Sequence, residues 1–210
     1  MTKILYLKTS PRGDASYSNR VGDHVVDELR KAHPGASLTE RDLAQEQPAH
    51  LDRHYLAALG TPQDKRGEPE QARLEHADTL IDELLASDVA VISVAMINFA
   101  IPSTLKSWID IVARAGRTFR YDADGTQHGL ATGKRVILVQ AHGGQYCEKE
   151  NQSIDFVTPY LRHMFNFMGM TDIETIHVEG TIFGEEVAEK AVASGKARAS
   201  AHVTALSVAA

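Results

Sequence analysis

A hydroxyl-rich segment, residues 9–19, is the first part of the sequence whose residue types suit ligand chemistry. It contains Ser10, Ser16 and Ser18 and leads into a stretch with helical periodicity. A helix N-terminus presents unpaired N–H groups and a partial positive charge, which together favour a phosphate. Neither G-x-G-x-x-G nor G-x-x-x-x-G-K-[ST] occurs here, so a monophosphate suits the segment better than a dinucleotide or triphosphate. The alternative is that Ser16 or Ser18 only caps the helix.

A second segment, residues 95–102, is apolar apart from one amide. Met96, Ile97 and Phe99 could cover the face of a flat heteroaromatic ring, and Asn98 could meet its edge. The alternative is that the apolar side chains are core packing and that Asn98 caps the following helix.

A third segment begins Ala141-His142-Gly143-Gly144. Paired glycines let the backbone approach a ligand closely, so their N–H groups could bind a carbonyl oxygen and a ring nitrogen. A plain tight turn is the alternative. His142 titrates near neutrality and is a candidate proton donor, unless it is an ordinary solvent-exposed loop histidine. The sequence predicts no metal site.

The elements that position these segments alternate between strand-like runs and amphipathic helices, which is typical of a parallel sheet covered by helices. The predicted strands are residues 3–8, 36–42, 89–94, 134–140 and 173–179, and the predicted helices are residues 18–32, 70–86, 102–115, 156–167 and 185–203. This pattern favours an α/β, flavodoxin-like, doubly wound five-stranded parallel sheet with helices on both faces. The three segments then follow the first, third and fourth strands and meet beyond their carboxyl ends.

Two segments interrupt the alternation. Residues 43–71 carry three prolines and two glycines, and we expect a surface excursion with one short helix near residues 51–59. Residues 118–129 contain Tyr121 and an Asp124-Gly125 pair, which predicts a hairpin. We expect one domain over residues 1–210, because 210 residues leave little room for a second.

Composition excludes several classes of function. The net charge of -6, without a basic stripe, argues against a nucleic-acid partner. No apolar run reaches the ~20 residues that cross a bilayer, so no membrane association is expected. The single cysteine, Cys147, cannot form an internal disulfide, which agrees with a cytoplasmic protein, and no base is placed beside it to make it a nucleophile.

At the three segments the chain resembles the FMN-dependent NADH-azoreductases, a family of flavodoxin-like quinone reductases. The resemblance runs from Lys3 to about Lys190 and includes residues 105–106, 112–116, 118–121 and 157–161. It implies that the FMN phosphate binds at Ser10, Ser16, Tyr17 and Ser18. It implies that the isoalloxazine ring lies against Met96, Ile97, Asn98 and Phe99, with its other edge at Ala141, His142, Gly143 and Gly144.

Two positions depart from the family pattern. Ile97 stands where family members often have tyrosine, and Ala141-His142 stands where they often have Ser-Arg. The first change replaces a ring beside the flavin with a branched aliphatic side chain. The second replaces a permanent cation with a titratable imidazole. Neither change removes the backbone groups expected to hold the ring.

The resemblance also implies an activity. NADH or NADPH would reduce bound FMN and leave, and a quinone or azo compound would then take two electrons in a ping-pong reaction. It implies a homodimer in which Tyr121 reaches the partner subunit's site. A one-electron carrier and a regulatory module that binds no flavin are the alternatives.

Overall fold

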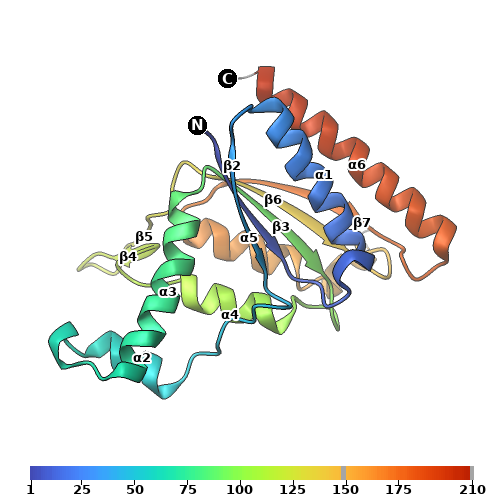
Figure 1. Ribbon diagram of the computed structural model, residues 1–210. Helices are drawn as coiled ribbons and strands as arrows, with labels where there is room; N and C mark the ends of the chain where they lie inside the picture. The colour runs from blue at the N-terminus through green and yellow to red at the C-terminus, as the bar shows by residue number, and fades with distance from the viewer. Residues whose placement is uncertain (148–149, 209–210) are drawn as a thin grey trace.

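A five-stranded parallel sheet lies at the centre of the computed structural model, which describes residues 1–147 and 150–208 (Figure 1). Its strands stand in the order β2-β1-β3-β6-β7, as expected for a flavodoxin-like sheet. They are β1 (Lys3–Lys8), β2 (Ser37–Asp42), β3 (Val89–Ala95), β6 (Arg135–Ala141) and β7 (Asp172–Val178). The predicted fold and the five predicted strands are confirmed.

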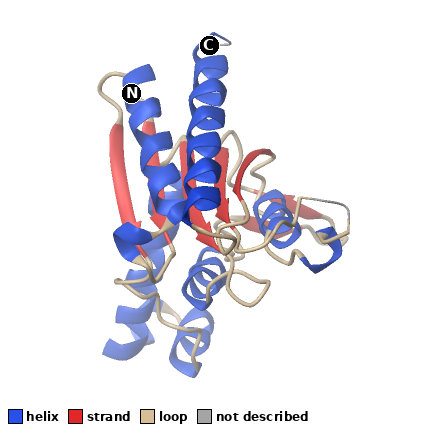
Figure 2. Ribbon diagram, turned by 90° about the vertical axis from the view of Figure 1, so that its right-hand side faces the viewer, coloured by secondary structure: helices blue, strands red, loops and turns tan. Residues whose placement is uncertain are grey.

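Helices cover both faces of this sheet (Figures 1 and 2). They are α1 (Tyr17–Ala32), α2 (Arg53–Gly60), α3 (Glu68–Ala86), α4 (Ser103–Val112), α5 (Thr158–Phe167) and α6 (Glu185–Val208). Helices α1 and α6 pack on one face, and α3, α4 and α5 pack on the other. No helix in the described part of the chain is both long and apolar enough to cross a membrane.

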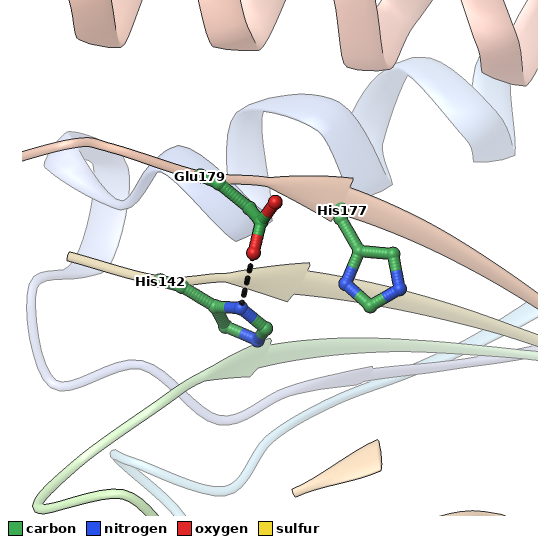
Figure 3. Close-up of side chains that lie close together, drawn as sticks. All are labelled: His142, His177 and Glu179. Carbon is green, nitrogen blue, oxygen red and sulfur yellow. Dashed lines mark hydrogen bonds and ion pairs between the residues drawn. The ribbon is translucent and has the colours of Figure 1, made fainter. Parts of the chain in front are cut away.

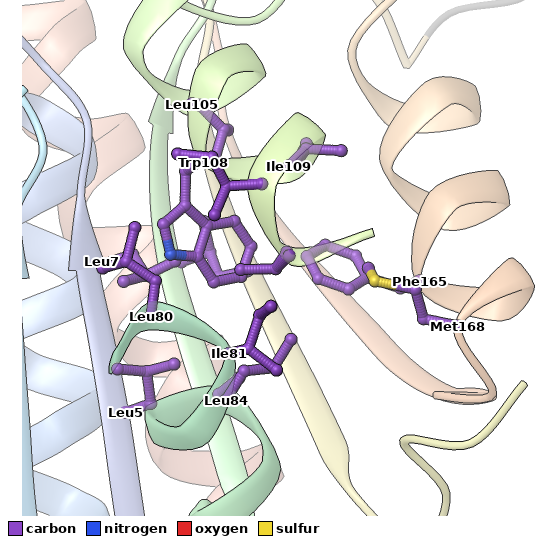
Figure 4. Packing of buried hydrophobic residues seen from close by; sticks show 14 of the residues in the cluster. Leu5, Leu7, Leu80, Ile81, Leu84, Leu105, Trp108, Ile109, Phe165 and Met168 are labelled. Carbon is purple, nitrogen blue, oxygen red and sulfur yellow. The ribbon is translucent and has the colours of Figure 1, made fainter. Parts of the chain in front are cut away.

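The alternation of side chains along β1 divides the core in two. Ile4 and Tyr6 face α1 and α6, whereas Leu5 and Leu7 face the other helices. On that second face Trp108 of α4 is fully enclosed by neighbours from the sheet, α3 and α5 (Figure 4). The first six residues of β3 are buried, as expected of a central strand covered on both sides.

Helix ends differ from the prediction in several places: α6 runs to Val208 instead of 203, and α4 and α5 are shorter than predicted. Helix α4 ends at Val112 instead of 115, because the Thr118 hydroxyl donates to the Val112 carbonyl (2.6 Å) and accepts from the Arg114 N–H (3.0 Å). Helix α5 begins at Thr158 instead of 156, because the Asp155 carboxylate accepts the N–H groups of residues 157 and 158. In both cases a side chain takes the place of a backbone partner.

The two interrupting segments take the expected local forms. The hairpin pairs β4 (Phe119–Tyr121) with β5 (Gln127–Gly129) in antiparallel fashion. In the 43–71 segment, α2 is the predicted short helix, and a 3₁₀ turn, η2 (Gln63–Lys65), follows it. Two further 3₁₀ turns lie elsewhere in the chain, η1 (Gly13–Ala15) and η3 (Gln152–Ile154). The 43–71 segment is not entirely superficial, since Leu43, Tyr55 and Ala58 belong to the buried core.

Helix α1 lies unusually close to the sheet at Gly22. A Cβ atom there would fall 2.0 Å from the Ser93 hydroxyl and 2.5 Å from the Tyr6 hydroxyl. These two hydroxyls lie 3.1 Å apart and also contact the start of the helix, where they donate to the carbonyls of Ser18 and Asn19. Glycine at position 22 thus allows β1 and β3 to fix the N-terminus of α1.

Replacing Gly22 with alanine is therefore expected to lower the free energy of unfolding by about 1–3 kcal/mol, the usual cost of overpacking a core. Urea denaturation measures this change. Gly60→Ala is the matched control, because a Cβ atom at Gly60 meets no atom within 4 Å. Equal stability of the Gly22→Ala variant and the wild type would contradict the close approach.

Candidate functional site

The three segments that the sequence singled out meet at the carboxyl edge of the sheet. The Thr9 hydroxyl donates to the Ser93 carbonyl (2.8 Å), which joins the loop after β1 to the end of β3. The Met96 N–H donates to the Ala141 carbonyl (3.0 Å), which joins the ends of β3 and β6. The rings of Phe99 and Tyr146 then contact edge to face, with centroids 6.3 Å apart. The structure therefore brings together three segments that are far apart in the sequence.

In the first segment Ser10, Ser16 and Ser18 are buried. Ser16 caps α1, since its Oγ accepts from the Asn19 N–H (3.3 Å) and lies 3.0 Å from Ser18 Oγ. Capping and anion binding are compatible here, because a hydroxyl has both a donor and two acceptor sites. The backbone N–H groups of Tyr17 and Ser18 donate to no other described residue, so they are available to an anion.

The second segment holds a conformation that its sequence does not reveal. Asn98 and Phe99 both have positive φ, at 49° and 68°, in a tight turn closed by two hydrogen bonds between Ile97 and Ala100. Left-handed backbone is tolerated by asparagine but costly for phenylalanine. Such strain clusters at ligand sites. The N–H groups of Asn98 and Phe99 find no acceptor within residues 1–147 and 150–208.

The alternative for the apolar residues of this segment is core packing. It holds only for Met96, which packs against the core. Core packing is wrong for Ile97 and Phe99, whose side chains are 40% and 48% exposed. Asn98 does not cap α4, since Pro102 occupies that position and no side chain caps the helix. Two apolar side chains and one amide therefore face solvent beside the first segment.

The glycines of the third segment use their carbonyls and leave their N–H groups unpaired. The Gly143 carbonyl accepts from the Ile182 N–H (3.2 Å), and the Gly144 carbonyl accepts from the Gly180 N–H (2.9 Å). Among the described residues neither glycine N–H donates a hydrogen bond. A Cβ atom on Gly143 would lie 2.9 Å from the Ile182 side chain, so the loop is closely packed on that side.

His142 is fully buried, so the interpretation as a solvent-exposed histidine is wrong. Its backbone N–H donates to the Val178 carbonyl (2.8 Å), and its ring atom Nδ1 lies 3.4 Å from the Oε1 atom of Glu179. Burial lowers the pKa of His142, and the neighbouring Glu179 carboxylate only partly opposes this effect. A neutral, enclosed imidazole does not favour the predicted role as proton donor.

Glu179 is a residue of this region that sequence reasoning missed. Its Oε1 atom accepts the backbone N–H groups of Tyr146 (2.6 Å) and Cys147 (3.0 Å), and so holds the loop after β6. Partial burial, together with a contact to Glu179, raises the pKa of the Cys147 thiol to about 12. The thiol is therefore protonated at neutral pH, which agrees with the expectation that Cys147 is not a nucleophile.

Tyr121 lies away from the three segments. The residue is 59% exposed, and its ring packs edge-on against Phe119 at a centroid separation of 5.9 Å. The hairpin that carries it projects from the side of the molecule opposite the arrowheads of β3 and β6 (Figure 1). Within one chain, Tyr121 therefore cannot contribute to the site at the carboxyl edge.

Two clefts open beside the second segment. One, of about 440 Å³, lies between Thr9 and Pro11 on one side and Ile97 and Asn98 on the other. The second, of about 600 Å³, is more apolar and is lined by Ala100, Ile101, Ser103, Lys106, Phe156, Pro159 and Tyr160. The sequence did not single out Phe156, which is 58% exposed. An apolar cleft beside a set of unpaired donors suits a flat aromatic ligand.

Residues 2–203 match the model of a family described as having a flavodoxin-like fold. The chain is 46% identical over 198 residues to an FMN-dependent NADH:quinone oxidoreductase of Agrobacterium fabrum, covering 94% of this chain and 96% of that protein.

Solved structures agree with this match. An azoreductase from Bacillus anthracis strain Sterne superimposes with a TM-score of 0.87 and 27% identity, over 97% of this chain and 99% of that one. An FMN-dependent NADH-azoreductase from B. anthracis strain Ames Ancestor, in complex with FMN, has a TM-score of 0.86 and 26% identity, over 97% and 100% of the two chains.

Ser16 is expected to act both in folding and in phosphate binding. Ser16→Ala should lower the free energy of unfolding by about 1 kcal/mol through loss of the cap. It should also weaken FMN binding by about 10-fold through loss of a hydrogen bond to a charged group. Fluorescence titration of the apoprotein with FMN measures the second effect.

Asp52→Ala is the matched control for this variant. Asp52 caps α2 by accepting the Tyr55 N–H (2.8 Å), and it lies outside the three segments. It should destabilise the protein without changing FMN affinity. If both variants bind FMN as the wild type does, Ser16 is a cap and nothing more.

Proposed function

We propose, for a chain that belongs to the flavodoxin-like family of FMN-dependent NADH:quinone oxidoreductases, that it binds FMN at the carboxyl edge of its sheet and reduces quinones by two electrons with NADH. The observation that carries this proposal is the convergence of unpaired backbone donors there. Within the described residues they come from Tyr17, Ser18, Asn98, Phe99, Gly143 and Gly144.

The donor set fits the cofactor part by part. Two N–H groups and the buried hydroxyls at the start of α1 suit a phosphate. The exposed faces of Ile97 and Phe99 suit the apolar side of a tricyclic ring. The glycine N–H groups suit ring carbonyl and nitrogen acceptors. Because the chain carries a net charge of -6, attraction of the phosphate has to come from these local groups.

FMN, when bound, supplies the two-electron chemistry, and the protein supplies position and electrostatics. We infer that Ser10, Ser16, Tyr17 and Ser18 anchor the phosphate. The turn at Asn98 and Phe99 is closed by two hydrogen bonds between Ile97 and Ala100, so it would present a fixed surface to a bound ring. The unpaired N–H groups of Gly143 and Gly144 would be the donors that stabilise negative charge on the ring when it is reduced.

In the proposed reaction NADH and the acceptor occupy the same site one after the other. The open clefts leave room for this exchange. The apolar cleft near Phe156 and Tyr160 is large enough for a planar acceptor. Quinones fit such a surface, and azo compounds, as in the azoreductase relatives, are a second class of acceptor. A one-electron carrier has less need of this apolar cleft. If the protein were a regulatory module that binds no flavin, the convergence of unpaired donors would have no explanation.

The proposal predicts a yellow protein. Purified protein should retain about one FMN per chain after dialysis, and anaerobic NADH should bleach the flavin absorption before any acceptor is added. A quinone should then restore the colour. Stopped-flow absorbance measures both steps. Flavin that is reduced only when NADH and quinone are present together would exclude the exchange of one substrate for the other.

We also propose a cytoplasmic homodimer that forms one flavodoxin-like FMN-binding domain per chain, over residues 1–210. The outward-facing Tyr121 and the exposed apolar residues Phe156 and Leu130 support a contact with a second subunit. In that arrangement Tyr121 completes the acceptor pocket of the partner. The surface thiol of Cys147 suits a reducing compartment.

Sedimentation should therefore give twice the mass of one 23.0 kDa chain. Tyr121→Ala should raise KM for quinone by about 10-fold, because a buried interface aromatic is lost. FMN affinity should not change. Steady-state kinetics measured beside sedimentation decides the matter, and a monomer with unchanged KM would disprove the shared pocket.

A further inference from the structure

His142, His177 and Glu179 form a cluster that the proposed reduction does not use (Figure 3). The register of β6 and β7 pairs Gln140 with His177, so two residues further on His142 lies opposite Glu179. Because side chains alternate along a strand, all three lie on the same face. Each offers one nitrogen or oxygen atom, and these atoms lie within 4.8 Å of one another.

One nitrogen atom of each histidine in this cluster is buried without a protein partner among the described residues. His142 Nε2 and His177 Nδ1 are buried and accept or donate no hydrogen bond within the described residues. Figure 3 shows His177 Nδ1 directed toward the other two side chains. An unsatisfied buried polar atom is destabilising, and native proteins retain few of them. His177 Nδ1, which faces the cluster, therefore calls for a ligand, and His142 would join it through Nδ1, the atom next to Glu179.

The separation of His142 and Glu179 also suits a shared ion. Their Nδ1 and Oε1 atoms are 3.4 Å apart, beyond the usual N–H···O range of about 2.7–3.2 Å. Two ligand atoms bound tetrahedrally to Zn²⁺ at about 2.0–2.1 Å lie roughly 3.3–3.4 Å from each other. Burial lowers the pKa of both histidines and so favours the neutral imidazole, which is the form that binds metals.

We propose that His142, His177 and Glu179 bind a divalent transition-metal ion of the zinc class. Two imidazoles and a carboxylate are an established ligand set for such ions, and three protein ligands leave a fourth position for water. A cleft of about 360 Å³, lined by Tyr146, Cys147, Asp155 and His177, gives the ion a path from solvent.

The bound ion would connect the end of β6 to β7, directly before the glycine pair. Gly143 follows His142 in sequence, and Glu179 already holds the N–H groups of Tyr146 and Cys147. The metal would therefore fix both ends of the loop that presents the Gly143 and Gly144 donors. This inference does not rest on the flavin, since its ligands are side chains on the inner side of the loop.

Isothermal titration of tag-free, chelator-treated full-length protein with ZnCl₂ tests the proposal. We expect one site per chain and a higher melting temperature with zinc, since an ion that binds only the native state stabilises it. His177→Gln and Glu179→Gln should each weaken binding by at least about 100-fold. Glu179→Gln keeps an oxygen to accept the loop N–H groups, so that variant should retain its fold.

His54→Gln is the matched control, because His54 pairs with a glutamate, Glu70, at 3.1 Å on a distant part of the surface. It should bind zinc as the wild type does. Absence of stoichiometric binding, or equal affinity in the His177→Gln and His54→Gln variants, overturns the proposal. Loss of binding in Cys147→Ser with retention in His177→Gln overturns it too, since the thiol would then be the site. Flavin absorbance in the same samples reports on the cofactor separately.

Discussion

The close contact of α1 with β1 and β3 is the constraint on which the rest of the site depends. Gly22 lets the helix approach until Tyr6 and Ser93 reach its first turn through hydrogen bonds. The N-terminus of α1 is thereby fixed relative to two central strands rather than to a flexible loop. A partial positive charge placed this firmly can act on an anion without first being ordered, which reduces the cost of binding.

The turn after β3 shows where the protein tolerates strain. The positive φ of Phe99 costs of the order of 1–3 kcal/mol, and such a conformation persists only if the surroundings enforce it. Backbone hydrogen bonds hold this turn in place. Met96 is hydrogen-bonded to Ala141, and Ile97 is hydrogen-bonded to Ala100. The Phe99 carbonyl accepts from the Phe156 N–H (3.1 Å). The turn leaves the N–H groups of two adjacent residues, Asn98 and Phe99, without an acceptor in the described part of the chain.

The fold was predictable because its signals are local. The run Val89–Val94 could only be a buried strand, and its neighbours alternated in the expected way. The ends of α4 and α5 were missed because Thr118 and Asp155 act through side-chain hydrogen bonds that depend on tertiary position. The three loops were correctly predicted to meet at one edge of the sheet. The strained backbone at Phe99 was not predicted, because phenylalanine is not a residue type that indicates positive φ.

His142 shows most clearly which features of the site could not be predicted from the sequence. A histidine beside two glycines suggests an exposed loop, and periodicity gives no reason to think otherwise. Its burial follows from the parallel register of β6 and β7, which places Glu179 and His177 on the same face, 37 and 35 residues away in sequence. Since the sheet alternates, the backbone of this loop can face one ligand while its side chain faces another. The same short loop can therefore serve a cofactor through its backbone N–H groups and an ion through its side chain, because the two roles use different atoms.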